Sequence, residues 1–162
     1  MIRPASPQDA AAVATLWNDM IRDTLATFTT EEKRIEDIQD LVHHRAGRFF
    51  VDELTGVIRG FGTFGRFRSG PGYVATCEHS IVVSPTALRQ SIGHRLMSHL
   101  QNAAQAQGNR IMVAAISGAN PDAVAFHLAC GFEKVGHLPE VGCKQGKWLD
   151  LILMQKNLSL GR

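Results

Sequence analysis

The sequence lacks the features of a membrane protein, a disulfide scaffold or a nucleic-acid-binding surface. No apolar run among its 162 residues approaches the roughly 20 needed to cross a bilayer, and the stretch Met1-Ile2-Arg3-Pro4 is not the start of a signal peptide. The three cysteines form no Cys-x-x-Cys pair, which favours reduced thiols. A net charge of +2 is too small to indicate nucleic acid. We therefore expect a cytoplasmic protein with neither a membrane nor a nucleic acid as its partner.

Metal ligands at regular spacing are also missing. Seven histidines are present, but His43-His44 and the pair His94 and His99 lack the i,i+3 or i,i+4 spacing that places two ligands on one helix face. The prediction is that the protein has no metal site. With 44% hydrophobic and 20% charged residues, the composition is that of an ordinary globular protein. The length predicts one domain, residues 1–162, large enough to bury a core.

Hydrophobic periodicity and capping signals predict a mixed α/β fold in the order β-α-α-β-β-β-α-β-α-β-β. Strands are predicted at 2–5, 48–52, 57–67, 73–83, 110–116, 132–135 and 148–155, and helices at 6–21, 30–47, 92–107 and 120–130. The glycine-rich stretch from Gly136 to Gly146 is predicted to join the last two strands. Gly60, Gly62 and Gly65 in the 57–67 strand indicate a bend or a close approach of another backbone.

One stretch, Cys77 to Leu100, combines a strand, a loop and a helix start. The β-branched run ends at Ser84-Pro85, a basic loop follows, and apolar residues at helical spacing begin at Ile92. This order places free backbone N–H groups and the positive end of a helix dipole beside a strand end, which suits a phosphate. The helix also connects two strands that could be parallel neighbours.

Eight stretches, in this order, resemble the GNAT superfamily of acetyl-coenzyme A (acetyl-CoA)-dependent N-acetyltransferases, and more narrowly its phosphinothricin and methionine sulfone/sulfoximine acetyltransferases. They are Ile2–Ala5, Trp17–Asp19, Ala26–Phe28, Glu78–Val83, Val113–Ile116, Asn120–His127, Gly131–Gly136 and Val141–Asp150. The resemblance covers nearly the whole chain and implies a GNAT fold: a central, twisted mixed sheet of about seven strands flanked by about four helices.

The loop that wraps the pyrophosphate departs from the family pattern Arg/Gln-x-x-Gly-x-Gly/Ala. Its six positions are Leu88–Gly93, so leucine replaces the leading residue and Ser91 replaces the first glycine. The residue after the leading one is commonly a further glycine in the family, and here it is Arg89. Glycine suits such a loop because it adopts positive φ and lets the backbone approach a phosphate. A changed loop path and weaker cofactor affinity are therefore expected.

By resemblance, acetyl-CoA lies where the strands 77–83 and 110–116 splay apart. An amine attacks the thioester directly in a ternary complex, so no protein nucleophile is required. The expected cofactor contacts are Ile81, Val82, Val83, Arg89, Gln90, Ser91, Ile92, Gly93, His94 and Asn120. Asn120 is also a plain helix N-cap, and the two roles are compatible.

Two residues are predicted to be catalytic. The resemblance places Glu78 as the base that takes a proton from the ammonium substrate, within about 3 Å or through one water; a cross-strand salt bridge is the alternative. His79 points to the opposite face of a regular strand, although a bulge could bring both residues to the cleft. His127 occupies the position at which many relatives have a tyrosine that assists the departing thiolate, although a lone helical histidine is often only packed.

The substrate site is expected to bind a carboxylate and an apolar side chain. Arg68 aligns with the arginine of the subgroup's substrate loop, and Arg66 is a second candidate for the contact with the carboxylate. The alternative is that Arg68 is an ordinary turn arginine that faces solvent. Phe28 and Trp148 are candidate apolar walls, although Phe28 could simply pack its loop and Trp148 could belong to the core. The predicted substrate residues are Phe28, Arg68, Ser69, Gly70, Glu78, His79 and Ser80.

The resemblance therefore implies an enzyme that moves acetyl from acetyl-CoA to a small amino-acid-like amine of the phosphinothricin or methionine sulfone/sulfoximine type. Two alternatives remain open. One is acetylation of a peptide N-terminus or a polyamine, and the other is a catalytically impaired CoA-binding protein, which the altered loop Leu88–Gly93 suggests. A homodimer is expected by resemblance alone.

Overall fold

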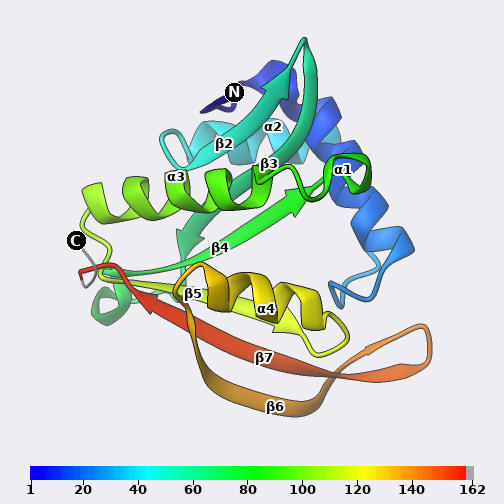
Figure 1. Cartoon of the computed structure of the whole chain (residues 1–162), viewed down its shortest axis with the longest axis vertical. Coiled ribbons are helices and arrows are strands. Elements are labelled where there is room, and N and C mark those ends of the chain that lie inside the picture. The colour runs from blue at the N-terminus through cyan, green and yellow to red at the C-terminus, as the bar shows by residue number, and fades with distance from the viewer. Residues whose placement is uncertain (160–162) are drawn as a thin grey trace.

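The computed structural model describes residues 1–159 as a seven-stranded sheet with helices on both faces (Figure 1). Its main elements are β1 (Ile2–Pro4), α1 (Ala10–Asp23), α2 (Ile35–His44), β2 (Phe49–Leu54), β3 (Val57–Arg66), β4 (Thr76–Val83), α3 (Ile92–Ala106), β5 (Ile111–Ser117), α4 (Pro121–Ala129), β6 (Glu133–Lys144) and β7 (Lys147–Asn157). Short 3₁₀ turns lie at Pro7–Asp9, Pro71–Tyr73 and Pro85–Ala87. The predicted mixed α/β class and element order are confirmed.

The strand order is β1-β2-β3-β4-β5-β7-β6, and only β4 and β5 are parallel neighbours. Their pairing is short: it begins at Thr76 with Ile111 and ends at Glu78 with Val113. Beyond that point the two strands diverge, as Figure 1 shows. The predicted splay between these strands is therefore present, and the backbone of β4 beyond Glu78 has no β5 partner.

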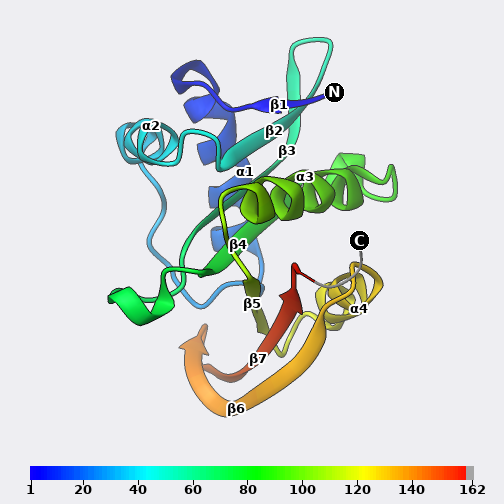
Figure 2. The same cartoon turned by 90° about the vertical axis from the view of Figure 1, so that its left-hand side faces the viewer.

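The helices divide between the two faces of the sheet, as the edge-on view in Figure 2 shows. α3 packs on β2, β3 and β4, and the glycines of β3 make room for it. A Cβ on Gly60 would lie 3.3 Å from Leu96, and one on Gly62 would lie 2.8 Å from Leu100. These glycines do mark a close approach, but the groups from α3 that approach are side chains and not the helix backbone. α1 and α2 cover the other face, where Trp17 packs on Phe61.

Two predictions about the strands were wrong. Tyr73 ends a 3₁₀ turn, and β4 begins only at Thr76. The stretch from Gly136 to Gly146 is not a long connection, because β6 continues to Lys144 and a two-residue turn leads into β7. Gln145 and Gly146 have φ of 52° and 73°, the left-handed pair that a tight hairpin turn requires. Register shifts in β6 conceal the period-two pattern of this strand from a sequence reading.

No helix in the described part of the chain combines the length and apolarity needed to span a bilayer.

Candidate active site

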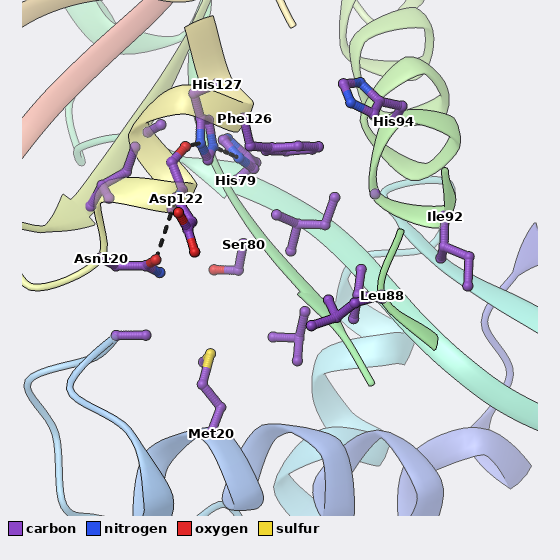
Figure 3. Close-up of a pocket in the computed structure, with 18 of the residues that line it drawn as sticks. Met20, His79, Ser80, Leu88, Ile92, His94, Asn120, Asp122, Phe126 and His127 are labelled. Carbon is purple, nitrogen blue, oxygen red and sulfur yellow. Dashed lines mark hydrogen bonds between the residues drawn. The ribbon is translucent and has the colours of Figure 1, made fainter. Parts of the chain in front are cut away.

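A cavity of about 560 Å³ opens where β4 and β5 diverge. It has lining residues from both faces of the sheet, so it reaches through the sheet. From the α3 and α4 face the lining includes His79, Ile81, Val83, Ile92, Gly93, His94, Phe126 and His127. From the α1 face it includes Trp17, Met20, Ala26, Thr27, Ser80 and Val82. Figure 3 shows Met20 facing the cavity from α1, opposite His79 and His127. Two substrates can thus approach one point from opposite faces.

The loop before α3 forms one end of this cavity. Helical hydrogen bonding in α3 starts with Arg95, whose N–H donates to Ser91 O at 3.0 Å. The N–H groups of Ile92, Gly93 and His94 precede that bond and have no helical acceptor. Together with the helix dipole they favour an anion such as a phosphate. The Ser91 hydroxyl makes no capping hydrogen bond at this helix start.

This loop keeps a glycine-like path without the glycines. Arg89 and Ser91 have φ of 64° and 60°, in the left-handed region that costs an L residue about 1–2 kcal/mol. Gly93, the glycine that the loop retains, serves a packing role: a Cβ there would lie 3.0 Å from the Phe126 ring of α4. At the start of α4, Asn120 is the predicted N-cap, and its Oδ1 accepts from Ala123 N–H at 3.2 Å.

Glu78 lies at the last paired position of β4, where the splay begins. It shares the α1 and α2 face with Ser80, whereas His79 points to the other face as predicted. Its cross-strand neighbour is Gly65, and a Cβ there would lie 2.5 Å from Nη2 of Arg45. The Arg45 guanidinium therefore occupies the space of the missing side chain. Burial raises the pKa of the Glu78 carboxyl, and the nearby charges of Arg45 and Arg68 partly offset that rise.

His79 and His127 form a buried pair whose two Nε2 atoms face each other. His127 Nδ1 lies 2.6 Å from Ala123 O, which can only accept, so this nitrogen carries a hydrogen. His127 Nε2 lies 3.0 Å from His79 Nε2, and His79 Nδ1 lies 3.3 Å from Val113 O. Burial lowers the pKa of His127, and burial together with His127 lowers the pKa of His79 to about 3. The pair is therefore neutral at pH 7, and both nitrogens of His127 have partners inside the protein.

This pair predicts a loss of stability in mild acid. An unfolded histidine titrates near 6.5, well above the pKa of folded His79, so only the unfolded chain takes up this proton as the pH falls. Between pH 6.5 and pH 5 the free energy of unfolding should fall by about 2 kcal/mol through His79 alone. Urea unfolding at several pH values measures this slope. His79→Gln should reduce the slope and His43→Gln, at an exposed position, should not; equal slopes in His79→Gln and the wild type would contradict the assignment.

Most of the predicted substrate residues lie outside the cavity lining, although Ala26 and Thr27, beside Phe28, belong to it. Arg68, Ser69 and Gly70 are exposed in the β3–β4 connection, and the Arg68 guanidinium lies over the Phe67 ring at 5.1 Å. The Phe28 ring packs against Gly142 of β6, and a Cβ on Gly142 would overlap that ring. Trp148 is 68% exposed, so the core alternative for this residue was wrong.

The structure brings most of the predicted cofactor residues to one cavity. Those in its lining are Ile81, Val82, Val83, Arg89, Ser91, Ile92, Gly93, His94 and Asn120. The predicted substrate residues His79 and Ser80 and the predicted catalytic residue His127 line it as well. Phe28, Arg68, Ser69, Gly70, Glu78 and Gln90 are not among them. Sequence reasoning missed Met20 and Asp122, which line the cavity. Asp122 lies two residues after the N-cap Asn120. This short separation from a predicted cofactor residue was the signal that could have identified Asp122 as a lining residue.

The wall of the cavity near α1 is held by a buried lysine. Lys144, at the end of β6, is 3% exposed and donates to Ile21 O at 2.7 Å and to Thr24 O and Thr27 O at 2.9 Å. These carbonyls belong to the end of α1 and the loop after it. In the same loop the Thr27 hydroxyl oxygen is buried and has no hydrogen-bond partner among residues 1–159. An unsatisfied buried hydroxyl at a cavity wall is typical of a functional segment.

Within residues 1–159, no cluster of three or more His, Cys, Asp or Glu side chains is arranged to hold a metal ion.

Comparisons with known proteins agree with this architecture. Residues 13–132 match the family model described as acetyltransferase (GNAT) family. The L-methionine sulfoximine/L-methionine sulfone acetyltransferase of Salmonella typhimurium is 33% identical, with 97% of this chain and 94% of the relative covered. The phosphinothricin N-acetyltransferase of Streptomyces viridochromogenes is 32% identical, with 98% and 88% covered. The solved structure of the Salmonella typhimurium acetyltransferase yncA with its cofactor acetyl-CoA superposes with a TM-score of 0.95 at 32% identity, covering 100% of this chain and 95% of that one.

Proposed function

The chain belongs to the GNAT acetyltransferase family and is an acetyl-CoA-dependent N-acetyltransferase, and we propose that its acceptor is the primary amine of a small amino-acid-like substrate. The observation that carries the proposal is the cavity that reaches through the sheet at the splay of β4 and β5. One end offers free N–H groups to a phosphate. The other end lies between α1 and β4, where Met20 and Thr27 line it.

The residues at the first end fit a CoA thioester. N–H groups at 92–94 suit the pyrophosphate, and the left-handed residues Arg89 and Ser91 turn the loop around it. The unpaired backbone edge of β4 at Ile81–Val83 suits the amides of the pantetheine arm. When bound, acetyl-CoA supplies an activated acetyl group, so the protein needs to contribute only positioning and proton transfer.

Glu78 is the proposed base. An ammonium group between Ser80 and the α1 wall would lie on the same face as the Glu78 carboxylate, which can take its proton directly or through one water. The raised pKa of Glu78 suits that role, because a base is most effective when its pKa approaches the working pH. Attack by the free amine on the thioester in a ternary complex then needs no nucleophile from the protein.

His127 is the proposed proton donor to the departing sulfur. The role has a structural cost, since His127 Nδ1 bonds Ala123 O and Nε2 bonds His79. His127 must exchange its His79 partner for the sulfur and carry a proton on Nε2. The cavity wall at His79 and His127 is where this exchange would occur (Figure 3).

The proposal is tested by two assays on the purified chain. Acetyl-CoA should raise the melting temperature, and thiol release should follow with methionine sulfone, methionine sulfoximine or phosphinothricin but not with spermidine or a peptide N-terminus. Release with the polyamine or the peptide alone would favour the alternative acceptors. A stable complex with acetyl-CoA without release from any amine would favour an impaired CoA-binding protein.

Arg68 is proposed to bind the substrate carboxylate, which gives a specific prediction. Arg68→Gln should raise the KM for the amino acid about tenfold, because it removes a charge-assisted hydrogen bond to the substrate, with kcat little changed. Steady-state kinetics with the acid and its carboxamide measure the effect, and the carboxamide should be nearly insensitive to the substitution. Arg66→Gln is the matched control in the same loop, where Arg66 donates to Gly70 O at 3.3 Å. Equal losses in both variants would contradict a specific role for Arg68.

The homodimer and the cytoplasmic location stay predictions. Exposed apolar side chains on α4 and on the β6–β7 hairpin offer a surface for a second copy: Leu128, Val135, Leu138, Val141 and Trp148. Sedimentation analysis of the purified chain tests the dimer.

A further inference from the structure

Gln90 lies between the two left-handed residues of the loop and is bound on two sides. Its side-chain Oε1 accepts from Arg59 Nη1 at 3.1 Å, and its backbone oxygen accepts from Arg95 Nη1 at 2.9 Å. One arginine comes from β3 and the other from α3, so the loop is tied to two separate elements. Each bond has a charged donor, which makes it stronger than a bond between neutral groups.

Both arginines are themselves anchored on Asp52 of β2, whose side chain is fully buried. Arg59 Nε and Nη2 lie 2.8 and 2.7 Å from Asp52 Oδ2, and Arg95 Nη2 lies 3.4 Å from Oδ1. A buried carboxylate with two guanidinium partners has a defined position, because leaving it unpaired would be costly. Asp52 therefore orients two arginines whose remaining N–H groups point to the loop.

The β3 strand is irregular at the position where Arg59 needs to turn. Asp52 pairs with Gly60, but the next residue of β2 pairs with Ile58, so Arg59 is an extra residue opposite β2. A bulge of this kind re-aims the side chain of the extra residue. Here it directs Arg59 to the α3 face, where Asp52 and Gln90 lie.

We propose that Asp52, Arg59 and Arg95 form a clamp on Gln90 that holds the loop 88–93 in its phosphate-binding path in place of the missing glycines. The inference rests on the proposed function, in which this loop binds the pyrophosphate of acetyl-CoA. The three residues are positioning residues, because they act through Gln90 and not on the substrate. Loss of the clamp lowers the fraction of molecules with a competent loop, and the apparent Kd for the cofactor rises in inverse proportion to that fraction.

Gln90→Met tests the clamp, since methionine has a similar length and cannot accept the bond from Arg59 in the same way. We expect the Kd for CoA, measured by calorimetry, and the KM for acetyl-CoA to rise about tenfold with kcat little changed. Hydrogen exchange at the amides of residues 89–94 should accelerate in the protein without ligand. A side chain that merely touches the cofactor would leave that exchange unchanged.

Rescue by glycine is the sharper test. Ser91→Gly should tighten CoA binding in the wild-type background, because glycine adopts the left-handed conformation without strain. In the Ser91→Gly background, Gln90→Met should cost less than about threefold in Kd, well below its effect in the wild type. Equal effects in the two backgrounds would overturn the proposal.

Gln107→Met is the matched control at the other end of α3. It also loses one side-chain hydrogen bond, from Gln107 Nε2 to Gly47 O at 2.9 Å, and should change neither the CoA affinity nor the exchange at 89–94. If the wild-type chain bound no CoA, the proposed function would fail, and the exchange measurement would still decide on the clamp. Unchanged exchange in Gln90→Met would overturn it.

Discussion

Replacement of Glu78 by glutamine is expected to lower kcat/KM for the amine by about 10²–10⁴-fold at pH 7. Glutamine keeps the size of the side chain and loses the ability to take a proton from the ammonium group. The Kd for acetyl-CoA should stay within about twofold of the wild type, because Glu78 lies on the α1 and α2 face, opposite the proposed cofactor end. Steady-state kinetics and calorimetry separate the two effects.

The pH profile gives the same substitution a second readout. A base works only when it is unprotonated, so wild-type activity should be lost as the pH falls through the pKa of Glu78, which burial raises above that of an ordinary glutamate. Glu78→Gln lacks this acid limb. Its residual rate should instead grow with pH as more of the amine is already deprotonated in water, and the gap to the wild type should narrow in alkali.

Glu133→Gln on β6 is the matched control, since Glu133 is an exposed strand glutamate away from the cavity. It should leave kcat/KM unchanged. A Glu78→Gln enzyme with the wild-type rate and the wild-type acid limb would remove Glu78 as the base.

The parts of the fold that local sequence signals specify were predictable. Apolar runs, capping residues and turn glycines placed three of the four helices and five of the seven strands closely, and the divergence of β4 and β5 followed from a family resemblance. The helix predicted at 30–47 was wrong at its start, because α2 begins only at Ile35 and its N-cap is Arg34. β6 was predicted only at 132–135, because register shifts and the left-handed Glu140 interrupt its alternation farther along. The hairpin turn at Gln145 and Gly146 was hidden within a glycine-rich stretch for the same reason.

Contacts between distant residues were beyond a sequence reading. Nothing near Glu78 in sequence indicates that Arg45 fills the space above Gly65, since this depends on the end of α2 meeting β3. The engagement of both ring nitrogens of His127 likewise depends on His79, 48 residues away. Residue types and their order therefore identified the region of the site, whereas packing determines which atoms are free to react.

Lys144→Met is expected to destabilise the fold by about 4 kcal/mol, because it removes three hydrogen bonds from a charged donor and leaves buried carbonyls unpaired. For a chain of this size the melting temperature should fall by about 10 °C. Thermal and urea unfolding measure the loss. Lys147→Met, at an exposed position across the same hairpin turn, is the matched control and should shift neither.

The same substitution should affect the acceptor more than the cofactor. Lys144 joins the end of β6 to the loop that carries Thr27 and Phe28, and that loop walls the acceptor end of the cavity. At a temperature where Lys144→Met is still folded, the KM for the amine should therefore rise several-fold while the Kd for acetyl-CoA is unchanged. A parallel loss of both affinities would show that the β6–β7 hairpin supports the whole domain and not the acceptor wall in particular. An unchanged KM for the amine would separate this loop from substrate binding altogether.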